Sequence, residues 1–159
     1  MMASTPRNLP GYLIDTNILL RLFRRLDSQH QLIKTALKEL NGQGTGLYFS
    51  LQNIAEFWNV CTRPAERNGY GLSVPETNRC VEEIERTMTF LPDNEQVYSI
   101  WRRLAMANNV RGVQVHDARL AAIMQVYGLT HILTLNQPDF LRYASLQAIH
   151  PSQLQPSAS

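Results

Sequence analysis

Apolar and polar positions along the chain form two alternating patterns, one typical of strands and the other of helices. Short apolar runs with the length of buried strands occur at residues 12–14, 47–49, 89–91 and 132–133, with a candidate fifth at 146–149. Apolar residues at helical spacing predict helices at 16–23, 30–40, 51–61, from Pro75 to about residue 88, 95–109 and 117–127. This alternation predicts an α/β fold: a three-layer α/β/α sandwich with a central, mostly parallel sheet of four to five strands.

Residues with strong positional preferences mark where several of these elements begin and end. Ser50 is a favoured N-cap for the helix that follows it, and Pro75 suits the first turn of the next helix. Gly128 is a typical helix stop, and residues 65–74, which contain two glycines, are predicted to form a loop. These boundaries support the alternating pattern because they separate its strands and helices.

The chain has the length of one domain, and its two ends differ in composition from the rest. We expect the 159 residues to form a single domain over residues 11–151. Residues 1–10 are polar and lack the apolar core of a signal peptide, so they are expected to be disordered or extended. Residues 152–159 are rich in Ser, Pro and Gln, which predicts a flexible tail.

Composition favours a folded cytoplasmic protein over a membrane or disulfide-stabilised one. Hydrophobic residues make up 44% of the chain, which is enough for an ordinary core. The most apolar early run, residues 12–23, is interrupted by charged and polar residues and is too polar to span a bilayer. Two cysteines, Cys61 and Cys80, are too few for a disulfide scaffold and lie in helical patterns, so we expect reduced, buried thiols. The net charge of +2 neither indicates nor excludes nucleic-acid binding.

Four acidic residues fall where a parallel sheet would gather them. Asp15 ends the first strand, and Asp139 follows the fourth strand by a few residues. Asp117 opens a helix, and Glu56 lies in the second turn of the helix after the second strand. Ligands of such sheets bind beyond the carboxyl ends of the strands. The four acids are far apart in sequence, so the fold is needed to bring them to one edge of the sheet.

A cluster of carboxylates has a clear chemical use. Carboxylates within a few ångströms of one another repel, and each raises the pKa of the others. A divalent cation such as Mg²⁺ removes that penalty, because hard cations prefer oxygen ligands. The bound ion makes a water molecule more acidic and offsets charge at phosphorus, which is how many enzymes hydrolyse phosphodiester bonds. The pattern therefore favours phosphodiester chemistry.

Each acid also has an ordinary structural explanation when it is taken alone. Asp15 is a favoured helix N-cap, and Asp117 in a first turn suits the helix dipole. Glu56 fits the solvated face of its helix, and Asp139 before Phe140 fits a turn. The joint pattern of four acids, rather than any one of them, favours a metal site.

Histidine, tryptophan and arginine residues near these acids have less specific interpretations. We interpret His116 as structural, because a metal-activated water needs no separate base, and Trp58 and Trp101 as core residues. Several arginines are candidate contacts for the phosphates of a nucleic acid, although a solvated helix face explains the Arg24-Arg25 pair equally well. The candidates for such contacts are Arg24, Arg63 and Arg119.

Four segments resemble, in order, the acidic motifs of the PIN-domain family. Residues 12–18 (YLIDTNI) resemble the opening motif and residues 53–57 (NIAEF) the second. Residues 115–122 (VHDARLAA) resemble the third motif and residues 134–140 (TLNQPDF) the fourth. The resemblance runs from about residue 11 to 151. Within the family, the chain is most like VapC, the toxin ribonuclease of type II toxin–antitoxin pairs, and residues 62–64 also resemble that subgroup.

The resemblance implies a PIN-like fold and roles for individual residues. Asp15, Glu56 and Asp117 match the acids that hold Mg²⁺ or Mn²⁺ in the family. Asp139 matches a position where a further acid often helps, whereas Asn136 stands where some members have an acid. Either residue is therefore a candidate for the fourth ligand. If Asp139 is that ligand, it would contact the ion through a water molecule.

The resemblance also implies supporting residues and partners. Asn17, Thr134 and Asn136 match polar positions beside the acids. The implied substrate is RNA, with single-stranded or looped RNA favoured because unstacked bases expose their edges. A small antitoxin protein would cover the site, and a homodimer is expected because PIN domains often dimerise. No membrane partner is implied.

The functional hypothesis from the sequence is a metal-dependent endoribonuclease that uses Asp15, Glu56, Asp117 and Asp139 and leaves 5′-phosphate ends. Two alternatives stay open: a PIN nuclease of RNA processing or decay, and a non-catalytic PIN module that binds RNA or protein. A Rossmann-type cofactor enzyme is disfavoured because no glycine-rich phosphate loop follows the first strand. A haloacid-dehalogenase-type phosphatase would need an acid where Asn17 stands.

Overall fold

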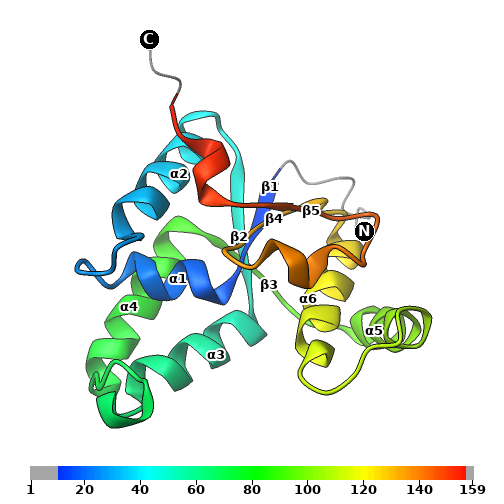
Figure 1. Ribbon diagram of the computed structural model, residues 1–159, viewed down its shortest axis with the longest axis horizontal. Coiled ribbons are helices and arrows are strands. Elements are labelled where there is room, and N and C mark those ends of the chain that lie inside the picture. Colours follow the sequence, from blue (N-terminus) through cyan, green and yellow to red (C-terminus); the bar gives the residue numbers. More distant parts are fainter. Residues whose placement is uncertain (1–10, 157–159) are drawn as a thin grey trace, which may run out of the picture.

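The computed structural model describes residues 11–156 and shows a parallel sheet between two layers of helices (Figure 1). Its strands are β1 (Gly11–Ile14), β2 (Gly46–Ser50), β3 (Thr89–Leu91), β4 (His131–Leu133) and β5 (Gln147–Ile149). Its α-helices are α1 (Thr16–Leu22), α2 (His30–Gly42), α3 (Leu51–Thr62), α4 (Val74–Thr87), α5 (Glu95–Ala107) and α6 (Gln114–Tyr127). The expected extended segment 1–10 lies outside the described residues.

The five strands are all parallel, and their order across the sheet is β3-β2-β1-β4-β5. In the centre of the sheet, Leu13 pairs with Tyr48 on one side and with Ile132 on the other. The chain builds outward from β1 through β2 to β3, then returns to place β4 on the opposite side of β1. The gap beyond the carboxyl ends of β1 and β4 is therefore the switch point where such sheets bind ligands.

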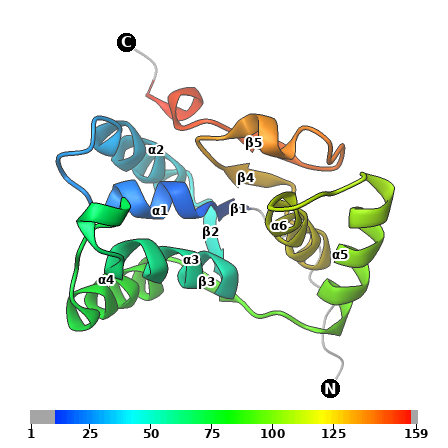
Figure 2. The same ribbon diagram turned by 60° about the horizontal axis from the view of Figure 1, so that its bottom comes forward.

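Alternating side chains on the strands supply a core to each face of the sheet. Ile14 and Leu133 belong to the core beneath α1, α2, α3 and α4, whereas Leu13 and Ile132 belong to the core beneath α5 and α6. All four side chains are fully buried. Figures 1 and 2 show the two helical layers on opposite sides of the sheet. The predicted three-layer α/β/α sandwich is confirmed, with a sheet that is wholly parallel.

Three segments differ most from the sequence-based expectation. Helix α6 begins at Gln114, one turn before the expected start, because the tight turn at Gly112, where φ is +54°, already directs the chain into it. Within the expected loop, residues Ala65–Arg67 form a 3₁₀ helix. Residues Pro151–Leu154, which include the first three residues of the expected flexible tail, form another 3₁₀ helix that packs beside α2 (Figure 1).

Two further expectations concern thiols and membrane segments. Cys61 is buried and Cys80 is half-buried, and both are free thiols. Burial raises the pKa of the Cys61 thiol to about 12, which makes it a poor nucleophile. Among residues 11–156, no helix combines the length and apolar character needed to cross a bilayer.

Candidate active site

Asp15 lies at the carboxyl end of β1 and is 9% exposed. It does cap α1, since its Oδ1 accepts a 2.8 Å hydrogen bond from the backbone N–H of Thr16. Its other oxygen, Oδ2, has a different partner: it accepts a 2.8 Å hydrogen bond from the hydroxyl of Thr134, just beyond β4. The structural and functional interpretations of Asp15 are therefore compatible, because one oxygen caps the helix and the other lies at the switch point.

The three polar residues expected to support the acids, Asn17, Thr134 and Asn136, form one network with Asp15. Thr134 is fully buried, and its Oγ1 accepts hydrogen bonds from the backbone N–H of Asn136 at 3.0 Å and from Asn17 Nδ2 at 3.4 Å. Asn17 also accepts a 3.2 Å bond at its Oδ1 from the backbone N–H of Leu135. The network fixes the segment after β4 against the first turn of α1, and so fixes the Asp15 carboxylate.

Glu56 is half-buried in the second turn of α3 and is held by Gln52, one turn earlier in the same helix. The Gln52 amide donates a 2.8 Å hydrogen bond to Glu56 Oε1 and a 2.9 Å bond to the backbone carbonyl of His116 in α6. Gln52 is 6% exposed. One buried amide therefore positions the carboxylate of α3 and ties it to the first turn of α6, where Asp117 follows His116.

A second buried amide joins α1 to α3. Asn53 is fully buried, and its Oδ1 accepts hydrogen bonds from the backbone N–H and the hydroxyl of Ser50, both at 2.9 Å. Its Nδ2 donates a 3.2 Å bond to the hydroxyl of Thr16, next to Asp15. Ser50 in turn caps α3 as the sequence predicts. The starts of α1 and α3 are thus held together behind the acids.

The remaining two acids differ in burial. Asp117 is half-buried in the first turn of α6, and Asp139 is exposed in the 3₁₀ helix Gln137–Phe140 that follows β4. Figure 2 shows the first turns of α3 and α6 facing each other across the ends of the central strands. Asp117 belongs to that first turn of α6, and Asp139 follows the carboxyl end of β4, so both acids lie at the same edge of the sheet as Asp15.

The charges of the four acids act on one another. Burial raises the pKa of Asp15 to about 6, the hydrogen bonds from Thr134 and Thr16 oppose that rise, and the charges of Glu56 and Asp139 add to it. The pKa of Asp117 is raised to about 7, first by burial and then by the charges of Asp139, Asp15 and Glu56. The four carboxylates therefore form one electrostatic group, which a nearby cation would stabilise.

The donor set suits a hard cation, although the acids are not arranged as a closed cage. Among residues 11–156, no three Asp, Glu, His or Cys side chains are arranged to hold one ion. The donors at the sheet edge are carboxylate oxygens, which Mg²⁺ and Mn²⁺ prefer, and Mg²⁺ is commonly held by one or two carboxylates with waters completing its shell. The mutual repulsion of the acids is a reason to bind a cation, so the chemistry of these donors, though not their present arrangement, fits such an ion.

The three candidate RNA-binding arginines are not gathered around the acids. Arg24 lies over the ring of Tyr70, 4.4 Å from its centroid, and Arg63 donates a 3.0 Å hydrogen bond to the carbonyl of Asn68. Both contact the turn that follows α3. Arg119 lies on α6 and pairs with Asp93. Two of these arginines thus contact the turn after α3, and the third pairs with Asp93 just before α5.

Sequence reasoning missed two residues that act on the acids. Gln52 could have been found, because it lies four residues before Glu56 and side chains at that spacing meet on a helix. Arg142 leaves no such signal. It lowers the pKa of Asp117 through its charge, and it donates hydrogen bonds to Gln114 at 3.1 Å and to the Asn108 carbonyl at 3.3 Å. It therefore links the segment that carries Asp139 to the start of α6.

Comparisons with known proteins agree with this architecture. The sequence profile of the PIN domain matches residues 12–146. A search of curated protein sequences finds no match. Among solved structures, the VapBC2 complex of Rickettsia felis, bound to a DNA fragment from its promoter, contains a similar chain. Its TM-score is 0.67 at 12% identity, over 87% of this chain and 97% of that one.

Two further solved structures have the same fold. A chain of VapBC-1 from nontypeable Haemophilus influenzae has a TM-score of 0.63 at 20% identity, over 89% of this chain and 98% of that one. VapC20 of Mycobacterium tuberculosis, described as a toxin that cleaves the sarcin–ricin loop, has a TM-score of 0.57 at 15% identity, over 77% and 87% of the two chains. With the profile match across most of the chain, the predicted membership is confirmed: the protein belongs to the PIN domain family.

Proposed function

We propose that the protein is a metal-dependent endoribonuclease of the VapC toxin kind, which cuts RNA at the switch point between β1 and β4. The observation that carries this proposal is the setting of Asp15. Its buried carboxylate is fixed by Thr134 and Thr16 at the end of β1. It lies within electrostatic reach of Glu56 and Asp139, on an edge that also carries Asp117.

The acids would hold Mg²⁺ or Mn²⁺, with Asp15, Glu56 and Asp117 as the main ligands and Asp139 completing the site. When bound, the cation would neutralise the acids and the scissile phosphate and would acidify a water molecule. The chain's own contribution is orientation. Thr134 holds one oxygen of Asp15, and the Gln52 amide holds Glu56. Asp139 is a better candidate than Asn136 for the fourth ligand, because its charge acts on both Asp15 and Asp117.

The proposed reaction is hydrolysis of the phosphodiester bond by in-line attack of water. Water adds to phosphorus as the bond to the 3′ oxygen of the preceding ribose breaks, so the products carry 5′-phosphate and 3′-hydroxyl ends. Attack by the neighbouring 2′-hydroxyl would instead leave a 2′,3′-cyclic phosphate. End-group chemistry therefore separates the two mechanisms.

The comparisons support the choice of RNA and of a protein partner. VapC20 is described as cleaving an RNA loop, and the two VapBC structures are complexes of two proteins. We carry over from them an RNA substrate, an antitoxin that covers the acids, and a cytoplasmic site of action. A homodimer is part of the same proposal, since PIN domains often dimerise.

Two alternatives keep the fold and change the role. A PIN nuclease of RNA processing or decay would cut RNA in the same way without an antitoxin, and a small adjacent gene encoding one would argue against it. A non-catalytic module would bind RNA or protein without cutting. The hydrogen-bonded Asp15 and Glu56 favour the nuclease, because a module that does not cut has no need to orient two carboxylates.

Cleavage of a labelled RNA pool tests the proposal. The wild type is expected to cut in Mg²⁺ or Mn²⁺, to stop in EDTA and to leave 5′-phosphates. Asp15→Asn and Asp117→Asn are expected to reduce cleavage at least a hundredfold. Glu66→Gln removes an equal charge from an exposed 3₁₀ helix remote in sequence and should leave cleavage unchanged. Cyclic phosphate ends, or equal cutting by Asp15→Asn, would overturn the proposed mechanism.

A further inference from the structure

A hollow of about 390 Å³ lies where the beginnings of α5 and α6 meet, beside the acids. Its apolar walls come from Val97, Tyr98 and Trp101 of α5 and from Val115 of α6, and His116 and Arg119 complete its rim. We call it the α5–α6 hollow. Its volume falls within the range of small-ligand pockets. None of the residues that hold the proposed cation lines it, so the proposed chemistry leaves this space unexplained.

The aromatic wall of the α5–α6 hollow is held in place. The indole N–H of Trp101 donates a 2.9 Å hydrogen bond to the backbone carbonyl of Val115, which fixes the ring between the two helices. The ring of Tyr98 lies 6.5 Å from it with an interplanar angle of 33°. Tyr98 is 61% exposed, which is unusual for a side chain of this size and apolar character. Tyr98 therefore presents an exposed aromatic ring beside the fixed ring of Trp101.

The hollow is adjacent to the proposed site of cleavage. The carbonyl of His116, on its rim, and the carboxylate of Glu56 accept hydrogen bonds from the same Gln52 nitrogen, at 2.9 and 2.8 Å. The two oxygens therefore lie within two hydrogen-bond lengths of each other. A nucleotide with its phosphate near Glu56 can reach the hollow with its base.

Polar groups suited to a base edge stand at the mouth. Arg119 pairs with Asp93, and both side chains remain partly exposed. Asn94 uses its Oδ1 to cap α5 at the N–H of Val97, at 3.1 Å, and its amide N–H groups are left to donate to a ligand. A donor amide, a carboxylate and a guanidinium next to an aromatic floor match the hydrogen-bonding edges of an unstacked base.

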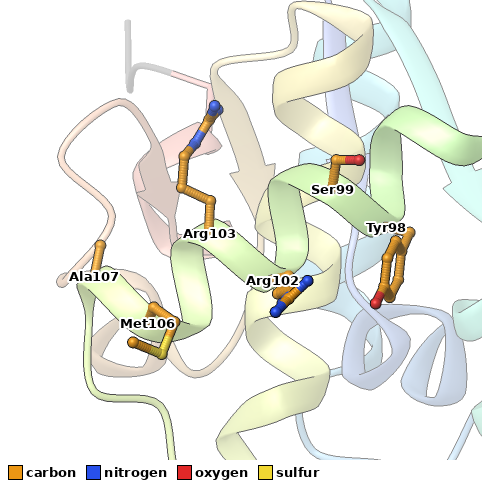
Figure 3. Close-up of a pocket in the computed structure, with 6 residues that line it drawn as sticks. All are labelled: Tyr98, Ser99, Arg102, Arg103, Met106 and Ala107. Atoms are coloured by element: carbon orange, nitrogen blue, oxygen red, sulfur yellow. The ribbon is translucent and has the colours of Figure 1, made fainter.

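The α5–α6 hollow continues into a basic face on α5. A second hollow of about 640 Å³ runs along this helix, and Tyr98 lines both. Figure 3 shows the side chains of Tyr98, Arg102 and Met106 on one side of α5, whereas Arg103 points the other way. Arg102 is exposed, so it is available to a phosphate of a strand that passes over Tyr98.

We propose that the α5–α6 hollow binds one unstacked base of the RNA substrate beside the bond that is cut, with Tyr98 as its stacking surface and Arg102 contacting the next phosphate. This inference rests on the proposed function, because it takes RNA as the ligand. It names Tyr98 and Trp101 as determinants of which nucleotide stands next to the cleaved bond. The positive charge of Arg102 favours RNA over an apolar protein segment as the occupant.

RNA binding can be tested without cleavage. The protein carries Asp15→Asn, so that it does not cut, and Trp58→Phe, so that Trp101 is its one tryptophan. Binding of single-stranded RNA oligonucleotides is expected to quench Trp101 fluorescence. Adding Tyr98→Ala should weaken binding about fivefold to a hundredfold, the loss typical of one base–aromatic stack. Tyr98→Phe should restore it, and Met106→Ala, which removes another exposed side chain from the same side of α5, should have no effect.

Two matched comparisons locate the base and the phosphate. Bases are removed from the oligonucleotide one at a time. At one position, removal should weaken binding to the Tyr98 protein by the same factor as Tyr98→Ala does. At that position, removal should not weaken binding to the Tyr98→Ala protein any further. Arg102→Ala should weaken binding and reduce its salt dependence, whereas its neighbour Arg103→Ala should do so far less. Equal effects of the two arginine variants would remove Arg102 from the proposal.

The outcomes separate this inference from the proposed function. RNA binding that leaves Trp101 fluorescence and the Tyr98→Ala affinity unchanged would overturn the base site and leave the nuclease proposal standing. No binding of any RNA by the otherwise intact, folded protein would overturn both. A dimer that Tyr98→Ala converts to a monomer would show that a second copy occupies the hollow, and would also overturn the base site.

Discussion

The hydroxyl of Thr134 donates a 2.8 Å hydrogen bond to Asp15 Oδ2 and so joins two residues that are 119 positions apart in the chain. Thr134 follows β4 and Asp15 follows β1, and these strands are neighbours in the sheet. The bond therefore spans the switch point itself. It favours the ionised form of this buried carboxylate, since it lowers the pKa of Asp15 against the effect of desolvation.

Replacing Thr134 by Val removes the hydroxyl and keeps the shape. The pKa of Asp15 should then rise above its value of about 6, and the acid limb of the pH–activity profile should move to higher pH. Thr134→Ser keeps the hydroxyl and should stay close to the wild type. The measurement is cleavage rate against pH for the three proteins. Identical profiles for Thr134→Val and the wild type would show that this bond does not control Asp15.

Stability of the metal-free protein should depend on pH through the same acids. Asp15 and Asp117 have pKa values raised on folding from 3.8 to about 6 and about 7, so the folded state binds their protons more tightly than the unfolded state does. Their contribution is therefore most favourable below about pH 4 and is lost as pH rises to about 7. For Asp15 the loss is at most about 3 kcal/mol.

Thermal unfolding of the wild type and Asp15→Asn checks this sign. In EDTA, Asp15→Asn should gain stability relative to the wild type as pH is raised from 5 to 8. Added Mg²⁺ should stabilise the wild type at pH 8 more than at pH 5, because protons and cations compete for the same carboxylates. A wild type that gains stability relative to Asp15→Asn over this range would contradict the raised pKa of Asp15.

Gln52 should control the affinity of the site for metal without binding it. Gln52→Leu removes the amide that holds Glu56 and the His116 carbonyl, and loss of such an orienting partner typically weakens metal binding about 10- to 100-fold. The Mg²⁺ concentration for half-maximal cleavage should rise by that factor. Gln31→Leu, which removes an exposed amide from α2, is the control. An unchanged Mg²⁺ requirement in Gln52→Leu would show that Glu56 needs no such support.

Asn53 should matter for stability rather than for catalysis directly. Asn53→Ala removes the hydrogen bonds to Ser50 and Thr16 and leaves buried polar groups without partners. The cost should be on the order of 3 kcal/mol, from the lost cap interactions and the unpaired groups. Denaturant unfolding measures it. A loss of unfolding free energy within about 0.5 kcal/mol is typical of surface substitutions. That result would show that Asn53 does not hold α1 and α3 together.

The fold and the positions of the acids follow from patterns that a single sequence carries. Each strand is a short apolar run, and in each helix apolar residues recur every three or four positions. The alternation of these two patterns predicts the parallel sheet. Because parallel strands end at one edge, the positions of Asp15 and Asp139 after their strands are enough to predict that both lie there. The strand order, which makes β1 and β4 neighbours, is a long-range property that periodicity does not encode.

Side-chain partners could be predicted less well. Gln52 and Asn53 look like ordinary polar residues of a helix, and their burial depends on packing against α6 and α1. Arg142 acts on Asp117 from a segment 25 residues later, a distance that leaves no periodic signal. Conversely, Arg24 and Arg63 are candidate phosphate contacts from the sequence, yet both contact the turn after α3.

Binding of Mg²⁺ to the purified protein near pH 6.5, measured calorimetrically in buffers of different ionisation enthalpy, tests the central claim most directly. The acids at the switch point are expected to bind the ion saturably and to release protons, because Asp15 and Asp117 are partly protonated at that pH. Both binding and proton release should fall sharply in Asp15→Asn and persist in Glu66→Gln. Mg²⁺ binding that releases no protons and is unchanged by Asp15→Asn would show that these acids are not the cation site.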